Sequence, residues 1–101
     1  MVSSRVKITF AKEGEMRFIS HLDLMRLFGR AVRRSGVPVA MSQGFSPHPK
    51  ISIEPALKLG LESRSLEARF GLSGRMDKEE LKERLPSGLP GGIEILEAEV
   101  S

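Results

Sequence analysis

The chain has 101 residues, and its 40% hydrophobic and 29% charged residues predict one soluble globular domain, residues 1–101, rather than a disordered chain. It contains no cysteine, which excludes disulfides, cysteine-based metal sites, thiolate catalysis and ligation of an iron–sulfur cluster by this chain. The net charge of +3 is uneven, because residues 1–53 balance to +6 and residues 54–101 to −3.

The sequence from residue 5 to residue 19 predicts a strand and an approach to a helix. Residues 5–10 alternate between apolar and polar side chains, which is typical of a half-buried strand with a basic outer face. Residues 12–15 form a polar turn, and residues 16–19 are mostly apolar, with Phe18 expected in the core. No apolar run has membrane-spanning length and no secretion signal opens the sequence, so we expect a cytoplasmic protein without membrane contact.

The stretch from Ser20 to Gly36 predicts an amphipathic helix whose two ends are marked. Ser20 can cap the first turn, with Asp23 three residues later, and Gly36 can adopt the left-handed turn that ends a helix. The apolar side comprises Leu24, Met25, Leu27, Phe28, Ala31 and Val32. The opposite side carries Asp23 and four arginines, Arg26, Arg30, Arg33 and Arg34. Because Asp23 is the one carboxylate on this side, the arginines repel one another unless an anion binds. The alternative is that this face is simply solvated, as many charged helix faces are.

A stiff loop follows this helix. Residues 37–41 can form a short strand, with Pro38 suited to an edge or a strand start. In residues 42–50, Pro47 and Pro49 restrict the backbone while Gly44 permits a turn. The loop carries Gln43, Phe45, His48 and Lys50.

The second half predicts more strands and one short helix. Residues 51–59, interrupted near Pro55, and residues 66–70 have strand patterns, and residues 93–100 form a last strand. A helix begins at Asp77, where Glu80 completes an acidic capping box, and ends near Pro86. The order predicts an α+β, ferredoxin-like sandwich: a mainly antiparallel sheet with two helices on one face and an added strand.

The arginine helix and the loop are close in sequence and together suit nucleic acid. Arginines bind phosphates, an aromatic ring stacks on a base, and polar groups meet base edges. The candidate RNA-binding residues are Arg26, Arg30, Arg33, Arg34, Gln43, Phe45, His48 and Lys50. Phe45 could instead anchor the loop against the core.

Two histidines leave a catalytic alternative open. A histidine pair beside cations can cleave a phosphodiester that has an adjacent 2′-hydroxyl, which would make His21 and His48 the catalytic residues of a small RNA endonuclease. A histidine at the first turn of a helix is more often a capping or core residue, and Asp23 suits a dipole partner or a tether for Arg26 better than a base. Two histidines without suitable spacing predict no metal site.

Residues 12–26, KEGEMRFISHLDLMR, followed by GVPVA at 36–40 and SQGFSPHPKIS at 42–52, resemble a radical-SAM-linked domain of unknown function. That bacterial family occurs alone or fused behind a radical SAM domain, and its members are often longer, so the chain could be the first portion of one. The resemblance implies a radical SAM enzyme as partner, and an association with RNA processing and the ribosome. The iron–sulfur cluster would belong to the partner, because this chain has no cysteine and is expected to hold no cofactor.

The leading hypothesis is therefore a non-catalytic accessory domain that binds a transfer or ribosomal RNA and presents it to a radical SAM modification enzyme. The alternatives are a docking module that grips the enzyme without RNA contact, and the two-histidine endonuclease. The position of His48 relative to Arg30 tests the composite site, because residues on opposite sides of the molecule could not share a ligand.

Overall fold

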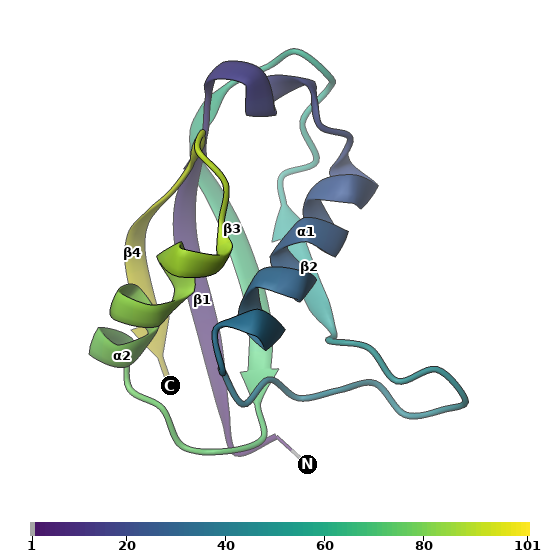
Figure 1. The fold of residues 1–101 in the computed structure, drawn as a ribbon, viewed down its shortest axis with the longest axis vertical. Coiled ribbons are helices and arrows are strands. Elements are labelled where there is room, and N and C mark those ends of the chain that lie inside the picture. Colours follow the sequence, from purple (N-terminus) through teal and green to yellow (C-terminus); the bar gives the residue numbers. More distant parts are fainter. Residues whose placement is uncertain (1) are drawn as a thin grey trace.

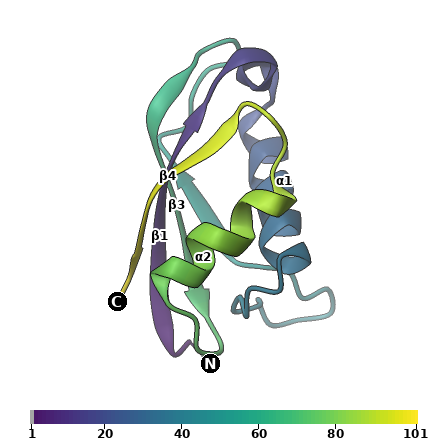
Figure 2. The same cartoon turned by 60° about the vertical axis from the view of Figure 1, so that its left-hand side comes forward.

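The computed structural model describes residues 2–101, which form a four-stranded antiparallel sheet with two helices on one face (Figures 1 and 2). The elements are β1 (Ser4–Lys12), η1 (Gly14–Phe18), α1 (His21–Arg34), β2 (Ile51–Glu54), β3 (Ser63–Leu72), α2 (Lys78–Arg84), η2 (Leu85–Gly88) and β4 (Ile93–Val100). The strand order is β2-β3-β1-β4. This arrangement is the expected α+β, ferredoxin-like sandwich. Within residues 2–101, no helix is both long and apolar enough to cross a membrane.

The core lies between the sheet and the helices. Alternate residues of β1, among them Ile8 and Phe10, are completely buried and face α1. The Phe10 and Phe28 rings pack with their centroids 5.1 Å apart. From α2 and η2, Leu81 and Leu85 complete the core. Because α1 buries one side in this way, its polar side is left in solvent.

Residues 37–41, the expected added strand, begin the sheet edge that pairs with β3. Residues 38–40 bind the end of β3, where Val39 forms an isolated bridge with Leu72 and the Ala40 N–H donates to the Gly71 carbonyl at 2.8 Å. β2 continues along the same edge of β3, with Ile51 opposite Phe70. Residues 41–50 are therefore looped out of one interrupted edge strand. In residues 37–41, Val39 and Met41 form isolated bridges instead of a continuous strand. Pro38 has no N–H to donate, and the chain leaves the sheet edge after Ala40.

Three further expectations differ from the structure. Phe18 is 51% exposed instead of buried, because η1 turns it outward and the Arg17 guanidinium lies over its ring, 4.3 Å from the centroid. β2 ends at Glu54 and residues 56–59 form no strand, since Pro55 cannot donate a ladder hydrogen bond. β1 continues through Lys12, which follows Ile8 and Phe10 on the inner side of the strand instead of belonging to a polar turn, and its side chain is buried.

Candidate nucleic-acid interface

The ends of α1 form as the sequence predicts, which fixes the direction of its arginine side. The Asp23 backbone N–H donates to Ser20 Oγ at 3.1 Å, and Gly36 has φ +75° just beyond the last turn. Leu24, Phe28 and Val32 are buried against the sheet. Arg26, Arg30, Arg33 and Arg34 are all exposed on the outer side.

The arginines of α1 have almost no carboxylate partners. Arg26 Nη1 lies 3.5 Å from Asp23 Oδ1, which is the tether that the sequence suggested, and both side chains are largely exposed. Within residues 2–101, Arg30, Arg33 and Arg34 make no ion pair. Repulsion among these guanidinium groups is therefore left for solvent ions or a ligand to offset.

The open face of the sheet differs, because three of its basic residues, Lys7, Arg64 and Arg69, are paired with glutamates. Lys7 Nζ lies 3.4 Å from Glu99 and 3.8 Å from Glu67, and Arg69 Nη2 lies 2.7 Å from Glu67. Arg64 pairs with Glu13 and Glu94 in the same way. Glutamates of the second half thus offset Lys7 and Arg69 on the sheet face. Within residues 2–101 they leave Arg30, Arg33 and Arg34 of α1, and also Arg5 of β1, without an ion pair.

The looped-out residues 41–50 form a hairpin that is closed at its base. The Ser42 N–H donates to the His48 carbonyl at 2.7 Å, and the His48 N–H donates to Ser42 Oγ at 3.1 Å. Ser42 Oγ also lies 3.0 Å from His48 Nδ1, and Met41 bridges Pro49. These bonds hold the hairpin so that it projects from the sheet edge near the C-terminal end of α1 (Figures 1 and 2).

The hairpin returns to the sheet beside Gly29 of α1. A Cβ atom at this position would lie 3.9 Å from both Pro49 Cγ and Ile51 Cδ1, so the chain re-enters the sheet directly beside the helix. Arg26, Arg30 and Arg33 are near neighbours of Gly29 along α1. This contact brings the base of the hairpin to the arginine side of the helix.

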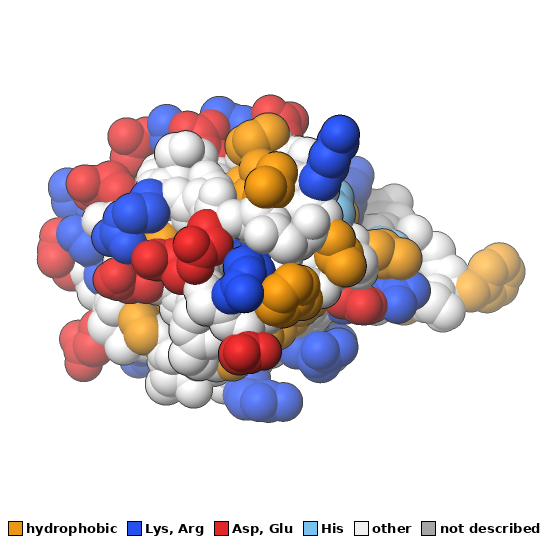
Figure 3. All heavy atoms as spheres, turned by 90° about the horizontal axis from the view of Figure 1, so that it is seen from above, with side chains coloured by type: hydrophobic (Ala, Val, Ile, Leu, Met, Phe, Trp, Pro, Cys, Tyr) orange, Lys and Arg blue, Asp and Glu red, His pale blue; other side chains and the backbone are white. Residues whose placement is uncertain are grey.

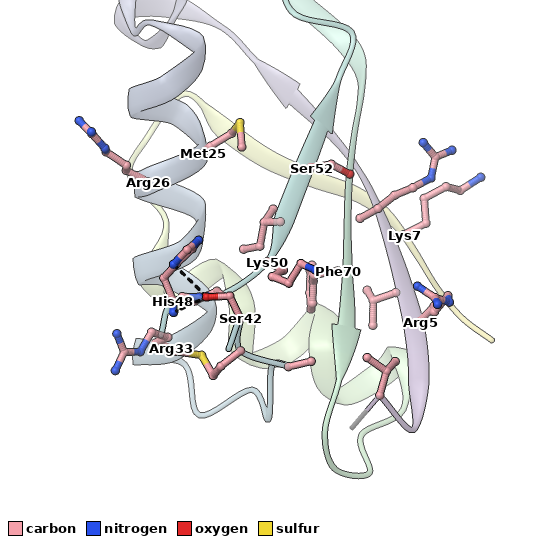
Figure 4. A pocket seen from close by; sticks show the side chains of 18 of the residues that line it. Arg5, Lys7, Met25, Arg26, Arg33, Ser42, His48, Lys50, Ser52 and Phe70 are labelled. Carbon is pink, nitrogen blue, oxygen red and sulfur yellow. Dashed lines mark hydrogen bonds between the residues drawn. The ribbon is translucent and has the colours of Figure 1, made fainter. Parts of the chain in front are cut away.

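An open groove of about 1710 Å³ lies where α1, the hairpin and the sheet edge meet (Figure 4). Most of the predicted site residues line it: Arg26, Arg30, Arg33, Gln43, His48 and Lys50. Its apolar wall includes Met25 and Phe70, and it extends round the edge to Arg5 and Lys7. Arg30 and His48 therefore border the same groove and do not lie on opposite sides of the molecule, and their sharing of one ligand stays a prediction.

Two predicted residues lie outside the groove. Arg34 is exposed on α1 but does not line it. Phe45 is fully exposed, with a relative exposure of 110%, so the alternative that it anchors the loop in the core is wrong. The projecting hairpin carries its ring, whose faces are accessible for stacking on a planar group.

The two histidines are not brought together. His21 is the first residue of α1 and does not line the groove, whereas His48 lies in the groove with Arg33, near the last turns of α1 (Figure 4). The 14 residues of α1 span about 20 Å at 1.5 Å per residue. A general acid and base at these two positions would not reach one phosphodiester, so the structure gives the endonuclease alternative no support. Within the described residues, no group of carboxylates and histidines could hold a metal ion.

Sequence reasoning missed two features of this region. Ser42 closes the hairpin through His48, and a serine six residues before a histidine gives no recognisable signal. The second feature is an apolar surface at the end of the molecule that carries η1 and residues 55–62, viewed in Figure 3. Its large exposed side chains are Phe18, Leu59 and Leu61, and Leu22, which also lines the groove, is exposed at the start of α1.

The fold and the site together define a small α+β domain with a basic groove beside a projecting hairpin. The chain belongs to the bacterial family described as "Uncharacterized protein conserved in bacteria (DUF2344)", whose model matches residues 5–101. This match confirms the expected bacterial family of unknown function, and the association with radical SAM enzymes stays a prediction. No curated protein and no solved structure matches the chain.

Proposed function

We propose that the protein is a non-catalytic RNA-binding domain that presents a structured RNA, such as a transfer or ribosomal RNA, to a radical SAM modification enzyme. The observation that carries the proposal is the absence of carboxylate partners for Arg30, Arg33 and Arg34 within residues 2–101, beside a groove that also holds Lys50. Such a surface binds a polyanion because it gains favourable charge contacts and releases counterions.

The spacing of the arginines supports a nucleic-acid backbone over a single small anion. Arg26, Arg30 and Arg33 are three and four residues apart and follow one side of α1 over about 10 Å. A row of this length suits successive phosphates of one strand. In the proposal the arginines and Lys50 bind phosphates, while Gln43, Phe45 and His48 meet bases or riboses.

The radical SAM enzyme enters the proposal through the sequence resemblance. Such an enzyme supplies the reactive cluster, and the present domain would supply affinity for the RNA. Binding and chemistry would then be divided between two proteins or two domains.

Filter binding of transfer RNA at several salt concentrations tests the proposal. We expect Arg30→Ala with Arg33→Ala to lower the salt slope by about 1.5 and the affinity on the order of 30-fold at about 0.1 M salt, because two phosphate contacts are lost. Arg64→Ala with Arg75→Ala is the matched control, since it removes the same charge away from the groove. An equal loss of RNA affinity in both double variants, or an affinity that does not change with salt concentration, would count against a local RNA site.

A second candidate, docking to the enzyme without RNA contact, is favoured by the apolar surface. Phe18, Leu22, Leu59 and Leu61 are each at least half exposed. Phe18 lies beside Gly60, where a Cβ atom would be 3.9 Å from the Phe18 ring, so its ring is next to the loop that carries Leu59 and Leu61. Exposed apolar side chains gathered in this way commonly mark protein contacts.

Pull-down of a purified radical SAM enzyme distinguishes this candidate from RNA binding. A protein contact would survive high salt and fail in Leu59→Glu with Leu61→Glu, because the contact buries apolar surface. Lys58→Glu is a matched control that changes an exposed residue of the same loop. An interaction that disappears after RNase treatment would contradict direct docking.

A further inference from the structure

We infer that His48 makes the groove selective for RNA over DNA, by accepting a hydrogen bond from a ribose 2′-hydroxyl through its Nε2 atom. The inference rests on the proposed RNA-binding function and names the sugar that the site prefers. It begins from the hydrogen bonds that fix the imidazole at the base of the hairpin.

The contacts of Nδ1 assign the proton of the neutral ring. His48 Nδ1 lies 3.2 Å from the Ser46 carbonyl oxygen and 3.0 Å from Ser42 Oγ. A carbonyl oxygen can only accept a hydrogen bond, so a lone pair on Nδ1 would repel it at this distance. Ser42 Oγ already accepts from the His48 backbone N–H and has a second lone pair for an Nδ1–H donor. A proton on Nδ1 can be shared between the Ser46 carbonyl and Ser42 Oγ, so this tautomer is compatible with all of these contacts.

The proton on Nδ1 leaves Nε2 as an acceptor. In neutral imidazole one nitrogen donates and the other accepts. His48 is exposed and lines the groove with Arg33 and Lys50 (Figure 4). Nε2 is thus an acceptor beside Arg33 and Lys50, whose side chains can only donate.

With the His48 Nε2 acceptor beside arginines and Lys50, the groove favours a ligand that carries negative charge and also has a hydrogen-bond donor. A nucleic-acid backbone brings negative phosphates to the arginines, and the 2′-hydroxyl is the donor that only RNA places beside each phosphate. DNA also binds the cations but brings no 2′-hydroxyl to Nε2. The backbone contacts thereby supply affinity, and His48 distinguishes the two sugars.

Binding of three oligonucleotides of one sequence tests the inference: RNA, DNA and 2′-O-methyl RNA, at about pH 8, where imidazole is ordinarily neutral. We expect RNA to bind about 3- to 10-fold more tightly than either of the others, because 2′-O-methyl RNA keeps the ribose shape and loses only the O–H donor. His48→Ala should remove the preference, and His48→Gln should restore part of it through its amide oxygen.

The outcomes separate this inference from the proposed function. Arg33→Ala is the control, because it should weaken all three ligands by the same factor. If 2′-O-methyl RNA binds as tightly as RNA, or His48→Ala keeps the preference while Arg33→Ala still weakens binding, the inference is overturned and the proposed function stands. If arginine-dependent binding is missing altogether, both are overturned.

The tautomer is tested without any ligand. The ¹⁵N chemical shifts of the His48 ring in the free protein should show a protonated Nδ1 and an unprotonated Nε2. The opposite tautomer would overturn the inference whatever the binding data show, because Nε2 would then be a donor.

Discussion

Substitution of Phe45 should change RNA affinity without changing the stability of the fold. Its ring is fully exposed on the hairpin, so Phe45→Ala removes no core packing and should change the free energy of unfolding by less than about 0.5 kcal/mol. If the ring stacks on a base, the same change costs about 1–3 kcal/mol of binding, which weakens RNA affinity by about 5- to 150-fold. The salt slope should stay unchanged, since no phosphate contact is lost.

Fluorescence gives a direct assay of the same contact. The chain has no tryptophan and no tyrosine, so Phe45→Trp introduces its sole indole, which keeps a stacking surface. We expect transfer RNA to quench the emission of this variant and to bind it about as tightly as it binds the unmodified protein. The RNA affinity of Phe45→Ala, measured from the fluorescence anisotropy of labelled transfer RNA, completes the comparison. Unchanged emission on saturation with RNA, or unchanged affinity in Phe45→Ala, would refute base stacking at the hairpin.

The remaining predictions concern stability, measured by denaturant unfolding. Gly29→Ala should stabilise the protein by about 0.5–1 kcal/mol, because a helical glycine is replaced and the new Cβ would sit in ordinary contact with Pro49; a loss of stability would contradict this packing. Gly92→Ala should instead destabilise by about 1–3 kcal/mol, since φ is +93° and the Cβ would lie 2.6 Å from the Glu13 carbonyl oxygen; a neutral effect would contradict the strain. Burial lowers the pKa of Lys12 from its ordinary value of 10.5, so the unfolded chain holds this proton more tightly and stability should rise as the pH increases towards 10.5. Lys12→Met should remove that rise and stabilise the protein at neutral pH, and parallel pH curves for the two proteins would be the contrary result.

Local signals predicted the helices well because each signal is complete within a few residues. Ser20 and Gly36 mark the ends of α1, and the Glu80 N–H donates to Asp77 Oδ1 at 2.9 Å as the capping pattern implies. The alternation in residues 5–10 likewise predicts which side of β1 is buried. These patterns place the arginines on the outside of α1 without any knowledge of the tertiary structure.

What the sequence could not predict depends on contacts between distant residues. Residues 37–41 have the pattern of a separate strand, and only their pairing with β3 shows that they and β2 form one interrupted edge. Phe18 has the composition of a core residue, but its exposure depends on how η1 turns. Within the part of the chain that the structure describes, Arg30 has no carboxylate partner because of where the glutamates of the second half fold, which no local pattern reveals.

The central claim is that the arginine side of α1 and the hairpin form one RNA-binding surface. The most direct measurement is a titration of ¹⁵N-labelled protein with transfer RNA, followed by amide chemical shifts. We predict that the largest changes fall on residues 26–34 and 41–50, with little change in α2 and β4. Largest changes on α2 and β4, or no changes at saturating RNA, would contradict the claim.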